Sequence, residues 1–140
     1  MRVTVLGGGH GGYAAAVDFT LKGFETCLFT FNEERVRTLN ARENRIDYEG
    51  VWGTGSCQIY KITGSMKAAV EKTDLVVMNV PGTGHEKYLR ELKKYLSPET
   101  VLYMNPGHTG GCLLYTSNKS GFQILRHVFT RYRSPVWGIV

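Results

Sequence analysis

Residues 2–17 read RVTVLGGGHGGYAAAV, and this stretch predicts how the chain folds. It begins as a short, mostly apolar run typical of a buried strand, and it ends in an alanine-rich run typical of the first turns of a helix. Gly7, Gly9 and Gly12 lie between the two at the spacing G-x-G-x-x-G. A strand, a glycine turn and a helix in this order form the fingerprint of a dinucleotide-binding site.

Each glycine of the fingerprint has a separate expected task. Gly7 permits a tight turn, Gly9 lets the backbone approach a pyrophosphate, and Gly12 lets the helix lie close to the strand. The backbone N–H groups of Gly9, His10 and Gly11 are expected to point at the ligand, with the positive end of the helix behind them. The alternative is a tight connection that binds nothing. A P-loop is excluded, because no Gly-Lys-Ser/Thr closes the turn.

Length and composition predict one ordinary globular domain over residues 1–140. No run approaches the roughly 20 apolar residues that cross a bilayer, and the apolar start breaks too early for a signal peptide. Cys27, Cys57 and Cys112 are odd in number and form no C-x-x-C. They indicate free thiols in a reducing cytoplasm and no metal framework.

The net charge of +5 raises the question of a nucleic-acid partner. The basic residues lie in scattered patches, with no nucleic-acid-binding motif beside them. We therefore expect solvated helix faces and no nucleic-acid binding, and an anionic cofactor or substrate explains the sign equally well. One of these patches comprises Lys87, Arg90, Lys93 and Lys94.

The rest of the chain alternates between strand and helix patterns, which predicts a parallel sheet. The expected strands are Glu25–Thr30, Leu75–Val80, Thr100–Met104 and Val136–Val140, and a small antiparallel hairpin or edge excursion is expected within Ile46–Ile62. The expected helices are Glu33–Arg42 with Asn32 as N-cap, Ser65–Glu71, His85–Leu96 and Phe122–Arg131. This order predicts a single α/β domain with a Rossmann-type, doubly wound, mostly parallel sheet.

Two further loops follow expected strands and carry small residues. Val80-Pro81-Gly82 leaves room for a ribose, and Asn105-Pro106-Gly107 does the same while adding an amide that can bond a ribose or a nicotinamide carboxamide. Ligands of doubly wound sheets bind beyond the carboxyl ends of the strands, where these loops fall. The alternative is that both are merely short turns, which Pro and Gly favour in any case.

These motifs together resemble a known family. The run Gly7–Gly12, the loop Val80–Gly82 followed by His85, and above all Asn105-Pro106-Gly107-His108-Thr109-Gly110-Gly111 are similar to the N-terminal domain of octopine/nopaline (opine) dehydrogenases. The resemblance covers most of the chain and is weakest in residues 45–64 and after Tyr115. It extends to glycerol-3-phosphate and ketopantoate dehydrogenases, which share the fold without the last loop.

The resemblance implies an NAD(P)H-dependent reaction that joins an amino acid to a 2-oxo acid. An imine forms between the two substrates, and hydride from the nicotinamide reduces it. By position, Gly9, His10 and Gly11 would hold the pyrophosphate, Pro81 and Gly82 would flank the ribose, and residues 105–107 would lie near the nicotinamide.

The end of the second expected strand departs from the pattern of NAD-preferring enzymes, which place an acidic residue there. Here the strand ends at Thr30, followed by Phe31 and Asn32, and Arg35 comes one helical turn later. No carboxylate repels a 2′-phosphate, and Arg35 can pair with one, so we expect NADP rather than NAD. The alternative is that Glu33 or Glu34 replaces the missing acid.

The family also carries a helical second domain that binds substrate and supplies the catalytic groups. We expect that domain to be absent from these 140 residues, so that the chain is not catalytic alone and self-associates through uncovered apolar surface. His85 and His108 are candidate acid–base groups, and no catalytic residue is assigned.

Two other interpretations remain open at this point. One is a stand-alone nucleotide-sensing module of the kind that gates potassium transport systems, although those modules usually keep the acidic residue after the second strand and lack the Asn105–Gly111 pattern. The other is a degenerate domain that serves as an assembly surface.

Overall fold

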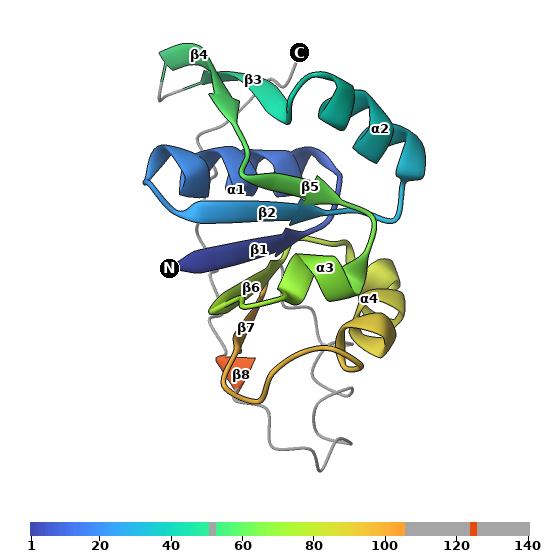
Figure 1. Cartoon of the computed structure of the whole chain (residues 1–140). Coiled ribbons are helices and arrows are strands. Elements are labelled where there is room, and N and C mark those ends of the chain that lie inside the picture. Colours follow the sequence, from blue (N-terminus) through green and yellow to red (C-terminus); the bar gives the residue numbers. More distant parts are fainter. Residues whose placement is uncertain (51–52, 106–123, 126–140) are drawn as a thin grey trace.

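A parallel sheet forms the centre of the molecule, and its strands run in the order β5-β2-β1-β6-β7-β8 (Figure 1). The computed structural model describes residues 1–50, 53–105 and 124–125. The strands of this sheet are β1 (Arg2–Leu6), β2 (Glu25–Phe29), β5 (Lys61–Thr63), β6 (Leu75–Met78), β7 (Val101–Met104) and β8 (Ile124–Leu125). All of their pairings are parallel, so the predicted doubly wound fold is confirmed.

Helices α1 (His10–Leu21), α2 (Glu33–Ala41), α3 (Met66–Val70) and α4 (His85–Leu92), with the short 3₁₀ helix η1 (Gly82–Gly84), connect the strands. Capping side chains and a glycine determine where several of these helices begin or end. Asn32 accepts a hydrogen bond from the backbone N–H of Arg35, as its N-cap role predicts, and Ser65 does the same for Ala68. Gly23, with φ +83°, ends α1.

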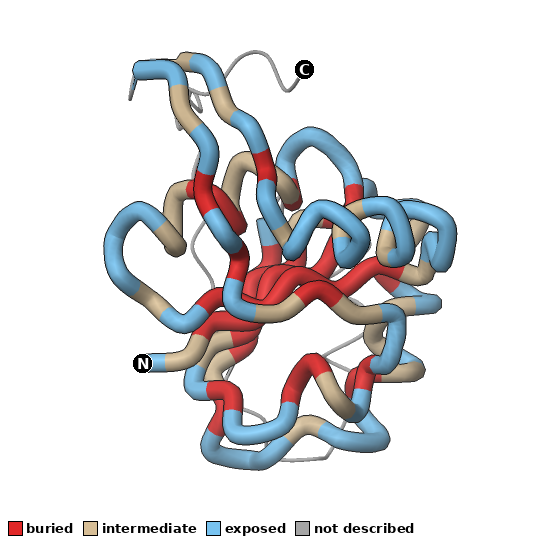
Figure 2. The backbone as a smooth tube through the Cα atoms, turned by 45° about the horizontal axis from the view of Figure 1, so that its top comes forward, coloured by how far each residue is buried: buried red, intermediate tan, exposed pale blue. Residues whose placement is uncertain are grey.

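The alternation of side chains along the strands builds one apolar core on each face of the sheet. Figure 2 shows that buried residues gather in the central strands. Leu6 and Phe29 point to the face covered by α3 and α4. Val5 and Leu28 point to the other face, where they pack with Ala16 of α1. The sheet is therefore buried on both sides, and only its ends and edges are open to a ligand.

The glycine-containing stretch between α2 and β5 forms the predicted antiparallel hairpin, with β3 (Arg45–Gly50) paired to β4 (Gly53–Gln58). The chain then returns to the sheet as β5, which pairs in parallel with β2. The sequence did not predict this last strand, because three residues carry too little pattern to identify.

The expected helix over Phe122–Arg131 is wrong at residues 124–125, which form β8 and pair with Leu102 and Tyr103 of β7. The backbone groups along the open side of β7 need hydrogen-bond partners, and tertiary pairing overrides a helical pattern in so short a run. The expected helix His85–Leu96 ends earlier, at Leu92. The expected strand Val136–Val140 lies outside the described residues.

The crossing of α1 over β1 leaves no room for a side chain. Gly7 has φ +124°, and a Cβ added to Gly12 would collide with the carbonyl oxygen of Gly7. A Cβ added to Gly9, by contrast, meets no atom of the described residues within 4 Å. The three glycines of the fingerprint therefore differ in what they tolerate.

The substitution Gly12→Ala is expected to lower the free energy of unfolding by about 2 kcal/mol or more, because backbone must move to relieve the overlap. Gly9→Ala is the matched control and should stay within about 1 kcal/mol of wild type, since only the helix cap changes. Urea denaturation followed by circular dichroism measures both. Equal stability of the two variants would contradict the close crossing.

Burial raises the pKa of the Cys27 thiol to about 11, although the charges of Lys61 and Arg2 oppose the shift. Because the folded state disfavours the thiolate, the unfolded chain loses the thiol proton at a lower pH than the folded chain does. The contribution of Cys27 to the free energy of unfolding is therefore complete below pH 9 and decreases as the pH rises toward 11. We expect Cys27→Ala to lose less stability than wild type between these two pH values, by up to about 2 kcal/mol. Denaturant titrations at pH 8, 9, 10 and 11 test this, and parallel pH profiles for the two proteins would contradict it.

Candidate functional site

The strand order reverses between β1 and β6, which lie side by side with Leu6 opposite Met78. The chain leaves β1 to form α1 on one face of the sheet and leaves β6 to form α4 on the other. In open α/β sheets, ligands bind outside the carboxyl ends of the strands at such a reversal. We call the residues that follow β1, β2, β6 and β7 the carboxyl edge; they are Gly7–Gly12, Thr30–Asn32, Asn79–Gly82 and Asn105.

The glycine turn forms the centre of this edge. The backbone N–H of Gly7 donates to the carbonyl of Phe29 at 2.9 Å, which ties the turn to the end of β2. Gly9, His10 and Gly11 are exposed, whereas Gly12 is buried. Among the described residues no side chain caps α1, and the first turn of this helix holds no acidic residue. The amino end of α1 therefore presents free N–H groups and a positive dipole beside open space at Gly9.

The end of β2 folds against the glycine turn. The Thr30 hydroxyl accepts from the N–H of Asn32 at 3.2 Å and lies beside Gly8, where an added Cβ would be 2.5 Å from Oγ1. Arg35 donates from Nη1 to the carbonyl oxygen of Gly8. The structure therefore brings Thr30, Asn32 and Arg35 together with the glycine turn.

Asn79, which the sequence analysis did not select, connects three parts of the edge. Its Nδ2 donates to the carbonyl of Gly11 at 3.0 Å, and its Oδ1 accepts from Nδ2 of Asn105 at 3.3 Å. The predicted site residue Asn105 is thus fastened through Asn79 to the first turn of α1. The sequence offered one indication of this role, because Asn79 places an amide directly after the apolar strand Leu75–Met78.

The loop after β6 exposes Pro81 and Gly82 and buries Val80. His85, only 2% exposed, lies behind this loop, with Nε2 2.8 Å from the Val80 carbonyl. Its Nδ1 is buried and has no hydrogen-bond partner within the described ranges of the chain. A ring held in this way supports the loop and does not reach the exposed edge, which favours a structural role over the proposed acid–base role.

An aromatic cluster stands next to the end of β2. Phe31 packs edge-on against Phe29 and Tyr88, with ring centroids 4.9 and 4.7 Å away. Burial raises the pKa of Tyr88, and hydrogen bonds to Thr30 and to the backbone of Phe31 oppose that shift. The ammonium of Lys87 lies 4.3 Å from the centroid of the Phe31 ring. The cluster was not predicted, because it joins residues far apart in the sequence.

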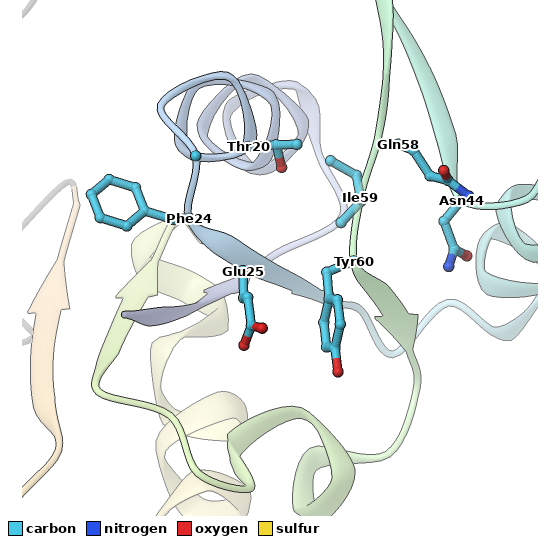
Figure 3. A pocket seen from close by; sticks show the side chains of 8 residues that line it. Thr20, Phe24, Glu25, Asn44, Gln58, Ile59 and Tyr60 are labelled. Atoms are coloured by element: carbon cyan, nitrogen blue, oxygen red, sulfur yellow. The ribbon is translucent and has the colours of Figure 1, made fainter.

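A separate pocket of about 450 Å³ lies at the opposite end of β2 (Figure 3). Glu25 begins β2 there, and its carboxylate already accepts from the Arg2 guanidinium at 3.0 Å. This pocket is remote from the glycine turn, which follows the other ends of the strands. Its lining residues are Thr20, Gly23, Phe24, Glu25, Asn44, Gln58, Ile59 and Tyr60.

Some predicted features fall outside the described residues, namely Pro106, Gly107 and His108. Within the ranges that the structure describes, no cluster of His, Cys, Asp or Glu is arranged to hold a metal ion. The same residues include no helix long and apolar enough to span a bilayer.

Comparison with known proteins identifies the family and the fold of this chain. Residues 2–111 match the family described as NAD-dependent glycerol-3-phosphate dehydrogenase N-terminus. An opine dehydrogenase of Arthrobacter sp. (strain 1C) is 30% identical over 109 residues, which are 78% of this chain. The fold is similar to that of octopine dehydrogenase in complex with NADH and agmatine (TM-score 0.62, 19% identity, 76% of this chain) and of NADP⁺-bound yersinopine dehydrogenase (TM-score 0.61, 17% identity, 73%).

The chain spans a minor part of each of these proteins: 30% of the Arthrobacter enzyme, 28% of octopine dehydrogenase and 27% of yersinopine dehydrogenase. The predicted resemblance to opine dehydrogenases and to their glycerol-3-phosphate dehydrogenase relatives is confirmed. The chain belongs to the family of NAD-dependent glycerol-3-phosphate dehydrogenase N-terminal domains and is an NAD(P)-binding domain with a Rossmann-type fold.

Proposed function

We propose that the carboxyl edge binds the dinucleotide with its pyrophosphate against Gly9, His10 and Gly11. The observation that carries this proposal is the uncapped amino end of α1, which lies where the strand order reverses and faces open space at Gly9. Free N–H groups and the helix dipole there favour an anion. The residues present therefore fit the cofactor.

The neighbouring residues would hold the remaining parts of the cofactor. Thr30 and Asn32 follow β2 and would meet the adenosine ribose. Pro81 and Gly82 would flank a ribose on the other side of the strand reversal. Asn105, with Pro106 and Gly107 after it, would lie near the nicotinamide, and its link to Asn79 supports a fixed orientation of the Asn105 amide.

We further propose that the site prefers NADP(H). The chain offers Thr30, Phe31 and Asn32 where NAD-binding domains place an acid, and Arg35 lies against the glycine turn. Glu33 and Glu34 stand in the first turn of α2, where they complement the helix dipole, and this explains their presence without a contact to ribose.

The chemistry would be that of an opine dehydrogenase: an amino acid condenses with a 2-oxo acid, and the resulting imine is reduced. Structures of octopine dehydrogenase with pyruvate and with L-arginine, a 2-oxo acid and an amino acid, support this substrate class. Bound NAD(P)H would supply the hydride. The residues described here would hold and orient the dinucleotide, while the groups that bind substrate and move protons would come from outside these 140 residues.

The first test uses Gly9→Ala, which fills the space in front of the α1 N–H groups while leaving the fold intact. We expect its Kd for reduced dinucleotide to rise about tenfold or more, because a hydrogen bond to a charged group is lost or stretched. Fluorescence titration of NADH and NADPH measures the affinity.

Tyr60→Ala is the control for binding elsewhere, since Tyr60 lines the remote pocket and is exposed. Its Kd should equal that of wild type. The proposal is wrong if Tyr60→Ala weakens binding and Gly9→Ala does not.

The second test concerns catalysis. We expect the 140-residue chain to bind reduced cofactor but to leave it unoxidised when amino acids and 2-oxo acids are added in pairs. Absorbance of the reduced nicotinamide follows the reaction. Turnover by this chain would contradict the requirement for residues beyond it.

A further inference from the structure

Phe31, the residue after Thr30, is held by an aromatic contact with Tyr88 of α4. Phe31 is partly buried, and its ring packs against Tyr88 of α4 with an interplanar angle of 71°. The Tyr88 ring also packs edge-on against Phe29 at the end of β2, with ring centroids 5.8 Å apart. The start of α4 is therefore fixed against the turn that follows β2, the turn at which an adenosine ribose would lie.

Lys87 precedes Tyr88 and places its ammonium 4.3 Å from the centroid of the Phe31 ring. Such a contact holds a cation in place without neutralising it. The other charged residues of α4 differ, because Arg90 pairs with Glu86, and Lys94, just beyond the helix, pairs with Glu91. In the described part of the chain, Lys87 has no carboxylate partner. Its charge is therefore available to an anion.

Arg35 approaches the same turn from α2, which packs on the opposite face of the sheet through Leu39. Its backbone N–H is bonded to Asn32, and its guanidinium to the Gly8 carbonyl. Arg35 also forms no ion pair among the described residues. Figure 1 shows α2 and α4 at the same end of the sheet, above and below the carboxyl end of β2. Lys87 thus contacts this turn at Phe31, and the guanidinium of Arg35 lies at Gly8 beside Thr30. Neither cation has a carboxylate partner among the described residues.

We propose that Lys87 determines cofactor specificity together with Arg35, and that the two cations bind the 2′-phosphate of NADP(H) from opposite sides of the Thr30–Asn32 turn. This inference rests on the proposed dinucleotide site and adds to it a residue of α4. A phosphomonoester dianion suits two cations, whereas the diol of NAD(H) gains nothing from the second. The Phe31 ring keeps the ammonium of Lys87 directed at the turn.

The test is Lys87→Met, which keeps an unbranched side chain over Phe31 and removes the charge. We expect its Kd for NADPH to rise about tenfold and its Kd for NADH to stay within about twofold of wild type. Adenosine 2′,5′-bisphosphate and AMP, used as fragments without nicotinamide, should show the same difference by calorimetry. Arg35→Met should act in the same direction.

Lys93→Met is the matched control, since Lys93 directly follows α4, is exposed and forms no ion pair within the part of the chain that the structure describes. Its loss is therefore expected to change only the net charge. Its ratio of NADPH to NADH affinity should equal that of wild type. Thermal unfolding tests whether each variant is folded. If Lys87→Met is not folded, Lys87→Gln takes its place in the binding measurements.

The outcomes separate this inference from the proposed function. If wild type binds neither dinucleotide, the proposed site itself is wrong. If wild type binds both and Lys87→Met leaves the affinity ratio unchanged, or weakens NADPH and NADH equally, Lys87 does not select the 2′-phosphate and the inference is overturned. A wild-type preference for NADH also overturns it.

Discussion

The close crossing of α1 over the end of β1 is the constraint on which the rest of the site depends. Gly12 lies against the carbonyl of Gly7 with no space for a side chain, so the helix axis starts directly behind the strand. This contact brings the positive end of α1 to the place where the strand order reverses. Asn79 then bonds the carbonyl of Gly11 and keeps the first turn beside the end of β6. Without the crossing, the free N–H groups would have no fixed relation to the neighbouring loops.

The sequence predicted those parts of the fold whose causes are local. The roles of Gly7 and Gly12, the N-cap at Asn32 and the hairpin between α2 and β5 follow from short patterns, and the structure agrees with them. Residues 124–125 were predicted wrongly because their partner, β7, lies about twenty residues away, and a local pattern cannot express pairing at that distance.

For the candidate site too, the sequence predicted only the features that depend on local sequence. The positions of Gly9 and Thr30 at the carboxyl edge were predicted because each follows a strand, and the structure places both of them there; their role in binding stays a prediction. Asn79 and Phe31 were missed, since what matters in each case is a neighbour from another segment. The basic patch Lys87, Arg90, Lys93 and Lys94 shows the same limit, because the sequence indicated only that most of the basic residues lie on solvated helix faces. In the structure Arg90 and Lys94 have carboxylate partners, and Lys87 has an aromatic one.

The hairpin β3–β4 has a consequence for how this chain can change length. Its backbone groups bond within the hairpin, up to the pair Gly50 and Gly53, while the register of β5 on β2 is set separately by Cys27 opposite Lys61. Lengthening the tip adds only a small loop-closure entropy and moves no strand of the main sheet. A peptide tag or a fluorescent label inserted between Gly50 and Gly53 is therefore expected to leave the carboxyl edge unchanged.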